Sequence, residues 1–190
     1  MKRILHRLAS VAVIALASSA WAQAPNPGPG SLGRGEAGFL TKAGEHGLAE
    51  VELGRLAQER GLREEVKSFG ARMVADHGKA NEELSRIAAA KRVELPTAPD
   101  KKHQRRLEDL RKQSGPDFDR AFMRRMVDDH REDVRDFERQ AKNARDADVR
   151  EFASRQVPVL RSHLESAQAT YDLTQGSKRY GKRETGSTKP

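Results

Sequence analysis

Two stretches of the chain carry an aspartate–histidine pair at the end of the same residue pattern. FGARMVADH occupies residues 69–77 and FMRRMVDDH occupies residues 122–130, and both fit F-x-x-R-M-V-x-D-H. Packing between helices explains why Phe and Met recur at helical spacing, but it gives no reason to repeat Asp and His. Imidazole and carboxylate groups that meet inside a helical bundle suit a divalent transition metal. The repeat therefore leads to the hypothesis of a metal site.

Histidines fall on the apolar face of every long helix that the sequence predicts. The four are His46, His77, His130 and His163. The rise of an α-helix places each about 24 Å from a hairpin turn, near the middle of helices about 40 Å long. We therefore expect the four side chains to meet at one level of the bundle. His103 is left out of this group, because it lies in the connection between the two predicted hairpins.

The predicted metal ligands are three of these histidines and one glutamate: His77, His130, His163 and Glu50. Adjacent residues of a helix diverge by about 100°, so the Asp and His of each repeat cannot easily bind one ion together. The residues expected to support the ligands through hydrogen bonds are Asp76, Asp129, Asp133 and His46. Iron, manganese, zinc and copper all suit such a donor set. The E-x-x-H signature typical of di-iron bundles is absent.

A second interpretation needs no metal. Asp–His pairs also bridge helices in polar networks that only fix how a core packs. On this interpretation the cluster sets the register of the helices and has no ligand. The residue types alone leave both interpretations open.

The elements that must position these residues are helices. Long stretches rich in Ala, Leu, Glu, Lys, Arg and Gln favour an all-α fold. Hydrophobic periodicity predicts four long helices and one short helix, at residues 36–60, 62–92, 101–112, 114–144 and 146–175. Gly61 is expected to end the first helix, Asp100 to cap the short one, and Asp146 or Asp148 to cap the last.

The lengths of the connections predict how the helices are joined. The first and third connections between long helices are tight, whereas the middle one takes about twenty residues and includes the short helix. A short, a long and again a short connection are typical of a ferritin-like four-helix bundle with one crossover. A plain up-and-down bundle is the alternative that the pattern leaves open.

Both ends of the chain are expected to lie outside the bundle, which spans residues 36–175. Residues 1–22 have three basic residues, an apolar stretch and small residues before a predicted cut between Ala22 and Gln23, which indicates a secretory signal peptide. Residues 23–35 form a Pro/Gly-rich linker. Residues 176–190 are predicted to be a disordered basic tail that contacts anionic envelope surfaces weakly, or simply stays in solvent.

Composition argues against several classes of function. The formal net charge of +8 comes mostly from the signal segment and the tail, so the helical region is close to neutral. Export and this balance argue against nucleic-acid binding. The absence of cysteine excludes disulfides and thiolate metal sites. No later hydrophobic span is evident, so we expect a mature protein released into the periplasm.

Several stretches resemble the exported bacterial proteins of domain-of-unknown-function family 4142. They are FLTKAGEHGLAEVELGRLA (39–57), VKSFGARMVADHGKANEEL (66–84), LPTAPDKKHQRRLEDL (95–110), SGPDFDRAFMRRMVDDH (114–130) and FASRQVPVLRSHLESA (152–167). The resemblance covers roughly residues 36–172 and implies a ferritin-like bundle. The residues that match family motif positions are Glu50, Asp76, His77, His130 and His163. His46 replaces what is usually a small or polar residue.

The sequence thus predicts an exported four-helix bundle that binds a transition metal at mid-core, in metal handling or oxidative-stress defence. The alternative is a metal-free envelope stress or interaction protein with a structural polar core. No substrate, reaction or oligomeric state follows from the sequence.

Overall fold

The computed structural model of the chain describes residues 32–184, and every regular element in this range is a helix. In chain order these are α1 (Arg34–Arg60), α2 (Glu64–Ala90), α3 (Lys101–Arg111), α4 (Gly115–Asn143) and α5 (Ala147–Glu184). The prediction of four long helices and one short helix is confirmed, with most bounds within two residues. The predicted signal peptide, most of the linker and residues 185–190 lie outside the described residues.

Contacts between the ends of the helices establish the topology. Lys91, just after α2, pairs with Asp146, just before α5, at 2.6 Å between Nζ and Oδ2. Asp119, near the start of α4, accepts hydrogen bonds from the backbone N–H groups of Leu62 and Arg63 in the α1–α2 turn. The ends of α2 and α4 therefore lie at one end of the bundle, and these two helices run in the same direction. This is the ferritin-like arrangement with a crossover, so the up-and-down alternative is excluded.

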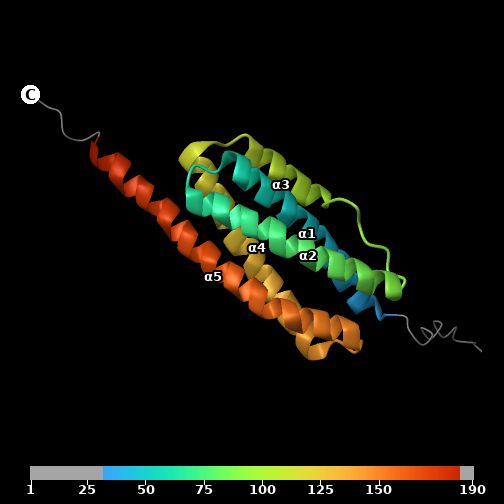
Figure 1. The fold of residues 1–190 in the computed structure, drawn as a ribbon. Helices are drawn as coiled ribbons and strands as arrows, with labels where there is room; N and C mark the ends of the chain where they lie inside the picture. Colours follow the sequence, from blue (N-terminus) through green and yellow to red (C-terminus); the bar gives the residue numbers. More distant parts are fainter. Residues whose placement is uncertain (1–31, 185–190) are drawn as a thin grey trace, which may run out of the picture.

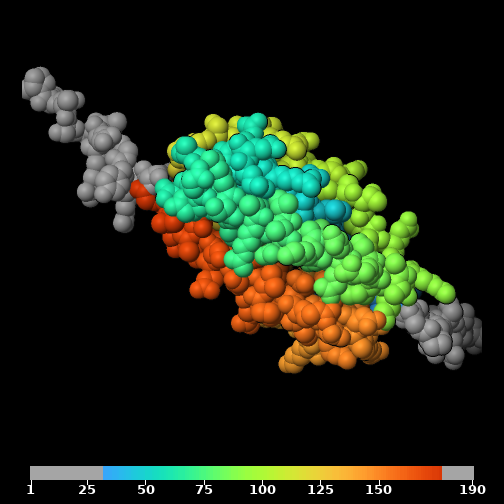
Figure 2. Space-filling model, in the orientation of Figure 1, coloured from blue at the N-terminus to red at the C-terminus, as the bar shows by residue number. Residues whose placement is uncertain are grey.

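The four long helices pack as two hairpins. α1 lies against α2 and α4 lies against α5, while α2 also contacts α5 and α1 also contacts α4. In Figure 1 the short helix α3 runs alongside α1 as part of the crossover. Figure 2 shows the face on which α2 and α5 meet.

Glycines bring α1 and α2 into unusually close contact. A Cβ atom added to Gly54 would lie 2.6 Å from the carbonyl oxygen of Gly70, and a Cβ added to Gly70 would lie 2.6 Å from that of Gly54. The two backbones touch here, which leaves no space for a side chain on either residue. This crossing lies one helical turn from Glu50 on α1 and two turns from His77 on α2, and therefore fixes how the two helices present these residues.

Side-chain caps define the crossover and the second hairpin, as predicted. The carboxylate of Asp100 accepts from the backbone N–H of His103 at 2.8 Å and begins α3. Leu107 and Leu110 are buried in the core and hold α3 against the bundle. Between the two candidates at the start of α5, Asp146 is the cap, since its Oδ1 accepts from the N–H groups of Asp148 and Val149.

The last helix is longer than the sequence predicts. Its end was placed at residue 175, but α5 continues to Glu184 and extends past the ends of the other helices in Figure 1. Lys and Arg, which recur after Ser177, are good helix formers, and a single Gly176 does not prevent the helix from continuing. No described helix is long and apolar enough to cross a membrane.

The core consists of two hydrophobic clusters with polar residues between them. One cluster includes Phe69, Met73, Phe122 and Met126, and the other includes Phe39, Leu84, Phe137 and Phe152. The histidines and acids predicted to form the site lie between these clusters along the helices, with Met73 one turn before His77 and Leu84 two turns after it. Each helix therefore contributes polar side chains to a layer at mid-bundle.

Candidate metal centre

Three buried histidines from three different helices meet in this layer. His77 comes from α2, His130 from α4 and His163 from α5, and one ring nitrogen of each lies within 4.8 Å of one from each of the others. The centroids of the three rings are 5.3–5.6 Å apart. Their exposed fractions are 7%, 0% and 1%, so the site is closed to solvent. We call these residues the three-histidine group.

Hydrogen bonds fix the tautomers of two of these rings. Nδ1 of His130 lies 2.9 Å from the carbonyl oxygen of Met126, and Nε2 of His163 lies 2.8 Å from Oδ2 of Asp76. Carbonyl and carboxylate oxygens accept hydrogen bonds, so each of these ring nitrogens must donate. The other nitrogen of each neutral ring therefore carries a lone pair.

The nitrogens that remain have no hydrogen-bond partner among the described residues. They are Nε2 of His77, Nε2 of His130 and Nδ1 of His163, all buried. Buried polar atoms are normally paired, because an unmade hydrogen bond costs about 1–3 kcal/mol. Three rings that meet at one place and each keep an unpaired nitrogen form an arrangement that a cation would complete.

The three rings are neutral at pH 7. Burial lowers the pKa of His77 well below its usual value, and the neighbouring rings of His130 and His163 lower it further. Burial also lowers the pKa of His130, although Asp133 and Asp129 oppose the shift. For His163, burial outweighs the hydrogen bond to Asp76 and lowers the pKa to about 4. Neutral imidazole is the form that binds metals.

The arginine of the repeated motif explains why an aspartate and a histidine stand next to each other in it. In both copies the Arg lies four residues before the Asp and pairs with it, Arg72 with Asp76 at 3.3 Å and Arg125 with Asp129 at 2.7 Å. The Asp therefore points along the helix toward its Arg, while the His, about 100° further round, points into the core. The motif therefore places a histidine beside a carboxylate whose position is fixed by an arginine.

The two aspartates then have different neighbours. Asp76 accepts from His163 on α5, and its pKa is lowered because His163 and Arg72 together outweigh the effect of burial. Arg72 also donates to Ser162 and Ser166 of α5. Asp129 instead faces the crossover, with Arg106 of α3 at 4.0 Å. Asp76 is therefore the aspartate that orients a ring of the three-histidine group.

The other two histidines among residues 32–184 form a separate paired group on α1, α3 and α4. Nδ1 of His46 lies 2.8 Å from Oδ1 of Asp133, and Nδ1 of His103 lies 2.9 Å from Oδ1 of Asp100. The two rings meet edge to face at 4.8 Å between centroids. Burial disfavours charge on His46, but the hydrogen bond and charge of Asp133 outweigh it and raise the pKa. We call these four residues the paired group.

Glu50 is buried beside the acids of α4 rather than among the three histidine nitrogens. Its Oε2 has no partner among the described residues. Burial raises the pKa of Glu50 well above its usual value, and the charges of Asp129 and Asp133 raise it further. The structure thus brings together three of the four predicted ligands. Glu50 lies in the same layer but outside the group whose ligand atoms lie within 4.8 Å of one another.

The sequence missed several residues that shape the site. His103 was left out because helical periodicity does not reveal where a crossover helix docks. The acceptor role of the Met126 carbonyl group is a backbone property with no sequence signal. Arg72 and Arg125, in contrast, stand four residues before the aspartates in both repeats, and this spacing is visible in the sequence.

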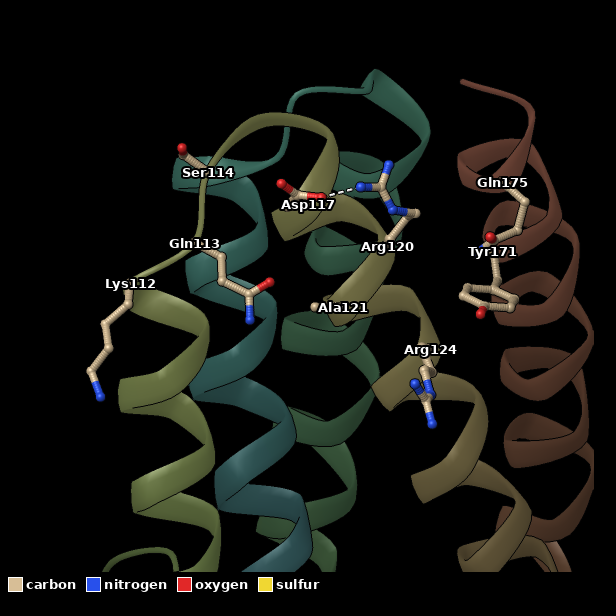
Figure 3. Close-up of a pocket in the computed structure, with 9 residues that line it drawn as sticks. All are labelled: Lys112, Gln113, Ser114, Asp117, Arg120, Ala121, Arg124, Tyr171 and Gln175. Carbon is tan, nitrogen blue, oxygen red and sulfur yellow. Dashed lines mark hydrogen bonds and ion pairs between the residues drawn. The ribbon is translucent and has the colours of Figure 1, made fainter. Parts of the chain in front are cut away.

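A larger pocket lies elsewhere on the described structure. It has a volume of about 580 Å³ and opens between the α3–α4 connection, the start of α4 and α5. In Figure 3, Asp117 pairs with Arg120 at its upper edge, and Arg124 and Tyr171 line its lower part. Tyr171 lies two turns beyond His163 on α5, and no histidine lines this pocket. It is therefore a surface feature separate from the polar layer.

The donor set fits a transition-metal ion. Three neutral imidazoles suit zinc, copper, iron and nickel, whereas manganese prefers carboxylate oxygens. A ligating histidine usually donates its other N–H to a carboxylate or backbone carbonyl, which is the arrangement of His163 with Asp76 and of His130 with Met126. The rings would have to converge slightly around an ion, because zinc–nitrogen distances are about 2.0–2.1 Å.

Comparisons with known proteins agree with this fold. The family described as Domain of unknown function (DUF4142) matches residues 21–170, which include both histidine groups. A solved structure titled "Crystal structure of DUF305 fragment from Deinococcus radiodurans" is similar, with a TM-score of 0.66 and 15% identity. The match covers 75% of this chain and 99% of that one. At this identity the likeness shows the helical fold alone. No curated protein matches the chain.

Proposed function

Because the chain belongs to the family of Domain of unknown function (DUF4142), its own residues must carry the functional argument, and we propose that it binds one transition-metal ion. The ligands are His77, His130 and His163. The observation that carries the proposal is that each ring keeps one buried nitrogen without a partner, and that the three rings offer nitrogens within 4.8 Å of one another. A purely structural network would instead pair these atoms with one another.

The donors favour an ion that prefers nitrogen. Of the four metals that the sequence suggests, zinc and copper suit three imidazoles best, iron less well and manganese least. The positive charge needs compensation in a buried site. The carboxylates of Asp76, Asp129, Asp133 and Glu50 surround the three-histidine group and would supply it. On this proposal Glu50 contributes to the charge balance and does not bind the ion.

The role that follows is metal handling or defence against oxidative stress outside the cytoplasm. The site is closed to solvent, which favours retention of an ion. Export rests on the signal segment at residues 1–22 and the predicted cut between Ala22 and Gln23. N-terminal sequencing of the protein from a periplasmic fraction should begin at Gln23. Recovery of uncut protein from the cytoplasm would contradict this part of the proposal.

The metal itself is tested by elemental analysis of protein purified without an affinity tag. We expect one transition-metal ion per chain, released by a strong chelator with a fall in melting temperature. His130→Ala should abolish retention, because it removes a ligand. His46→Ala is the matched control, since it removes a buried histidine from the same layer and should keep the ion.

The opposite result supports the metal-free alternative. If no metal is retained and chelation leaves the melting temperature unchanged, the proposal fails. The polar layer would then act as the paired group already does, by fixing the register of the helices in an envelope stress or interaction protein.

A further inference from the structure

A small cavity lies beside the three-histidine group, on one side along the bundle axis. Its volume is about 20 Å³, which is room for one water molecule. Ala80 and Leu84 line it from α2, and Asp133 and Phe137 line it from α4; all four follow the ligand of their helix by one or two turns. On α5, which runs in the opposite direction, the lining residue Leu160 precedes His163 by one turn. His77 itself completes the wall.

The opposite side of the group is closed. Met73 and Met126 lie one turn before His77 and His130 and are fully buried, and Phe69 lies behind them in the same hydrophobic cluster. The ring of Phe69 is 6.3 Å from that of His130. An ion among the three nitrogens would thus have packed apolar side chains in one direction and, beside the ring of His77, the cavity in the other.

Three of the four nearby carboxylates are occupied elsewhere, and the fourth, Glu50, does not line the cavity. Asp76 accepts from His163, Asp133 accepts from His46, and Asp129 pairs with Arg125. Zinc, cobalt and copper ions commonly take a fourth ligand, and three protein ligands with one open position are typical of sites that bind an exchangeable molecule. Three histidines beside a water-sized space have this arrangement.

We propose that a metal ion in the three-histidine group keeps one coordination position open toward this cavity and binds a small exogenous ligand there. The inference rests on the proposed function. The ligand class is water, hydroxide or a small inorganic anion, because the walls are apolar except for His77, the His46–Asp133 pair and the side chains of Asn81 and Gln156. The His46–Asp133 pair reaches the cavity and can exchange hydrogen bonds with the bound ligand.

The experiment uses Co(II) as the metal and fluoride, an anion about the size of a water molecule, as the probe. Visible absorption of Co(II) reports the number and kind of its ligands, so fluoride binding should change the spectrum in a saturable way with one site per ion. The titration of the wild-type protein decides the matter. A spectrum that stays constant up to saturating fluoride, with Co(II) bound, overturns this inference alone.

Two alanines on α2 provide a matched pair of variants. Ala80→Leu fills the cavity, and the affinity for fluoride should fall by about tenfold or more, because a filled site resists further atoms. Ala75→Leu adds the same side chain at an exposed position of the same helix and should behave like wild type. An Ala80→Leu protein that binds Co(II) and responds to fluoride like wild type also overturns the inference. If the wild-type protein binds no Co(II), the proposed function fails and this inference fails with it.

Discussion

The three-histidine group and the paired group lie side by side in one polar layer, yet the pKa of His46 is shifted in the opposite direction from the pKa values of the three-histidine group. In the paired group, His46 has a carboxylate at 2.8 Å, and its pKa is raised. In the three-histidine group, burial dominates, and the pKa values of all three rings are lowered. Burial alone therefore does not determine what a core histidine does. The identity and number of its hydrogen-bond partners decide whether it carries a proton or a lone pair.

The two groups also differ in what they leave unsatisfied. In the paired group, each histidine has a carboxylate as its hydrogen-bond partner. The three-histidine group keeps three nitrogens without partners. The hydrogen bonds of the paired group stabilise the fold. The unpaired nitrogens of the three-histidine group lower its stability but can bind a ligand. Variants that remove a hydrogen-bond partner from either group, or an unpaired nitrogen from the three-histidine group, test this comparison.

The largest expected effect concerns the carboxylate that orients a ligand. Asp76→Ala removes the acceptor that holds His163, so the metal affinity should fall by about 10–100-fold, as is usual when such a partner is lost. Asp133→Ala is the comparison variant, because its carboxylate holds His46 and no member of the three-histidine group; it removes only a share of the charge compensation, so the affinity should fall less. Competition with a chromophoric chelator measures both affinities. Equal losses in the two variants would show that the groups are not distinct.

The next effect is on stability, and its sign should differ between the groups. In chelator-treated protein, His46→Leu leaves the buried Asp133 without its partner and should lower the free energy of unfolding by about 2 kcal/mol. His77→Leu replaces an unpaired buried nitrogen with an apolar group and should raise it by about 1 kcal/mol. Urea denaturation provides both values. A similar decrease in the free energy of unfolding in both variants would show that the two groups do not differ in this respect.

The pH dependence of the metal-free protein should separate the groups ring by ring. NMR titration should place the pKa of His46 above 6.5 and that of His163 near 4, with His77 and His130 also below 6.5. Because unfolded His163 takes up its proton near pH 6.5 and the folded form only near pH 4, stability should fall as the pH decreases between these values. The contribution of His46 has the opposite sign and is lost as the pH rises through its raised pKa. Titration of all four rings near 6.5 would contradict the account.

The smallest effect comes from the arginine of the repeat. Arg72→Met removes an ion pair at a partly exposed position, and the metal affinity should fall by about twofold. Arg125→Met, in the other copy, should leave the affinity closer to wild type, because Asp129 does not hold a ring of the three-histidine group. The same chelator competition measures the difference. A larger loss in Arg125→Met would instead link Asp129 to the site.

Much of the fold could be predicted from the sequence, because helical periodicity and connection lengths are local properties. The convergence of His77, His130 and His163 was also predictable, since it needs only the distances of these residues from the hairpin turns. The contacts between helices were not predictable. The sequence gives no sign that Asp76 would reach His163 across the α2–α5 contact, or that α3 would bring His103 against His46.

The position of Glu50 shows the same limit at the site. Its helical phase places it on the core face of α1, as predicted, but the phase does not say which acids it will face. α1 packs beside α4, so Glu50 meets the charges of Asp129 and Asp133 instead of the three rings. Which helix lies next to which is a property of the whole bundle.

X-ray absorption spectroscopy of the zinc-loaded protein tests the central claim most directly, because it reports the atoms bound to the ion. Our account predicts three imidazole nitrogens at about 2.0–2.1 Å, with one further light atom, and the loss of this signature in His130→Ala. A shell made of carboxylate oxygens would place the ion at Glu50, Asp129 and Asp133 and contradict the account, as would protein that cannot be loaded with metal.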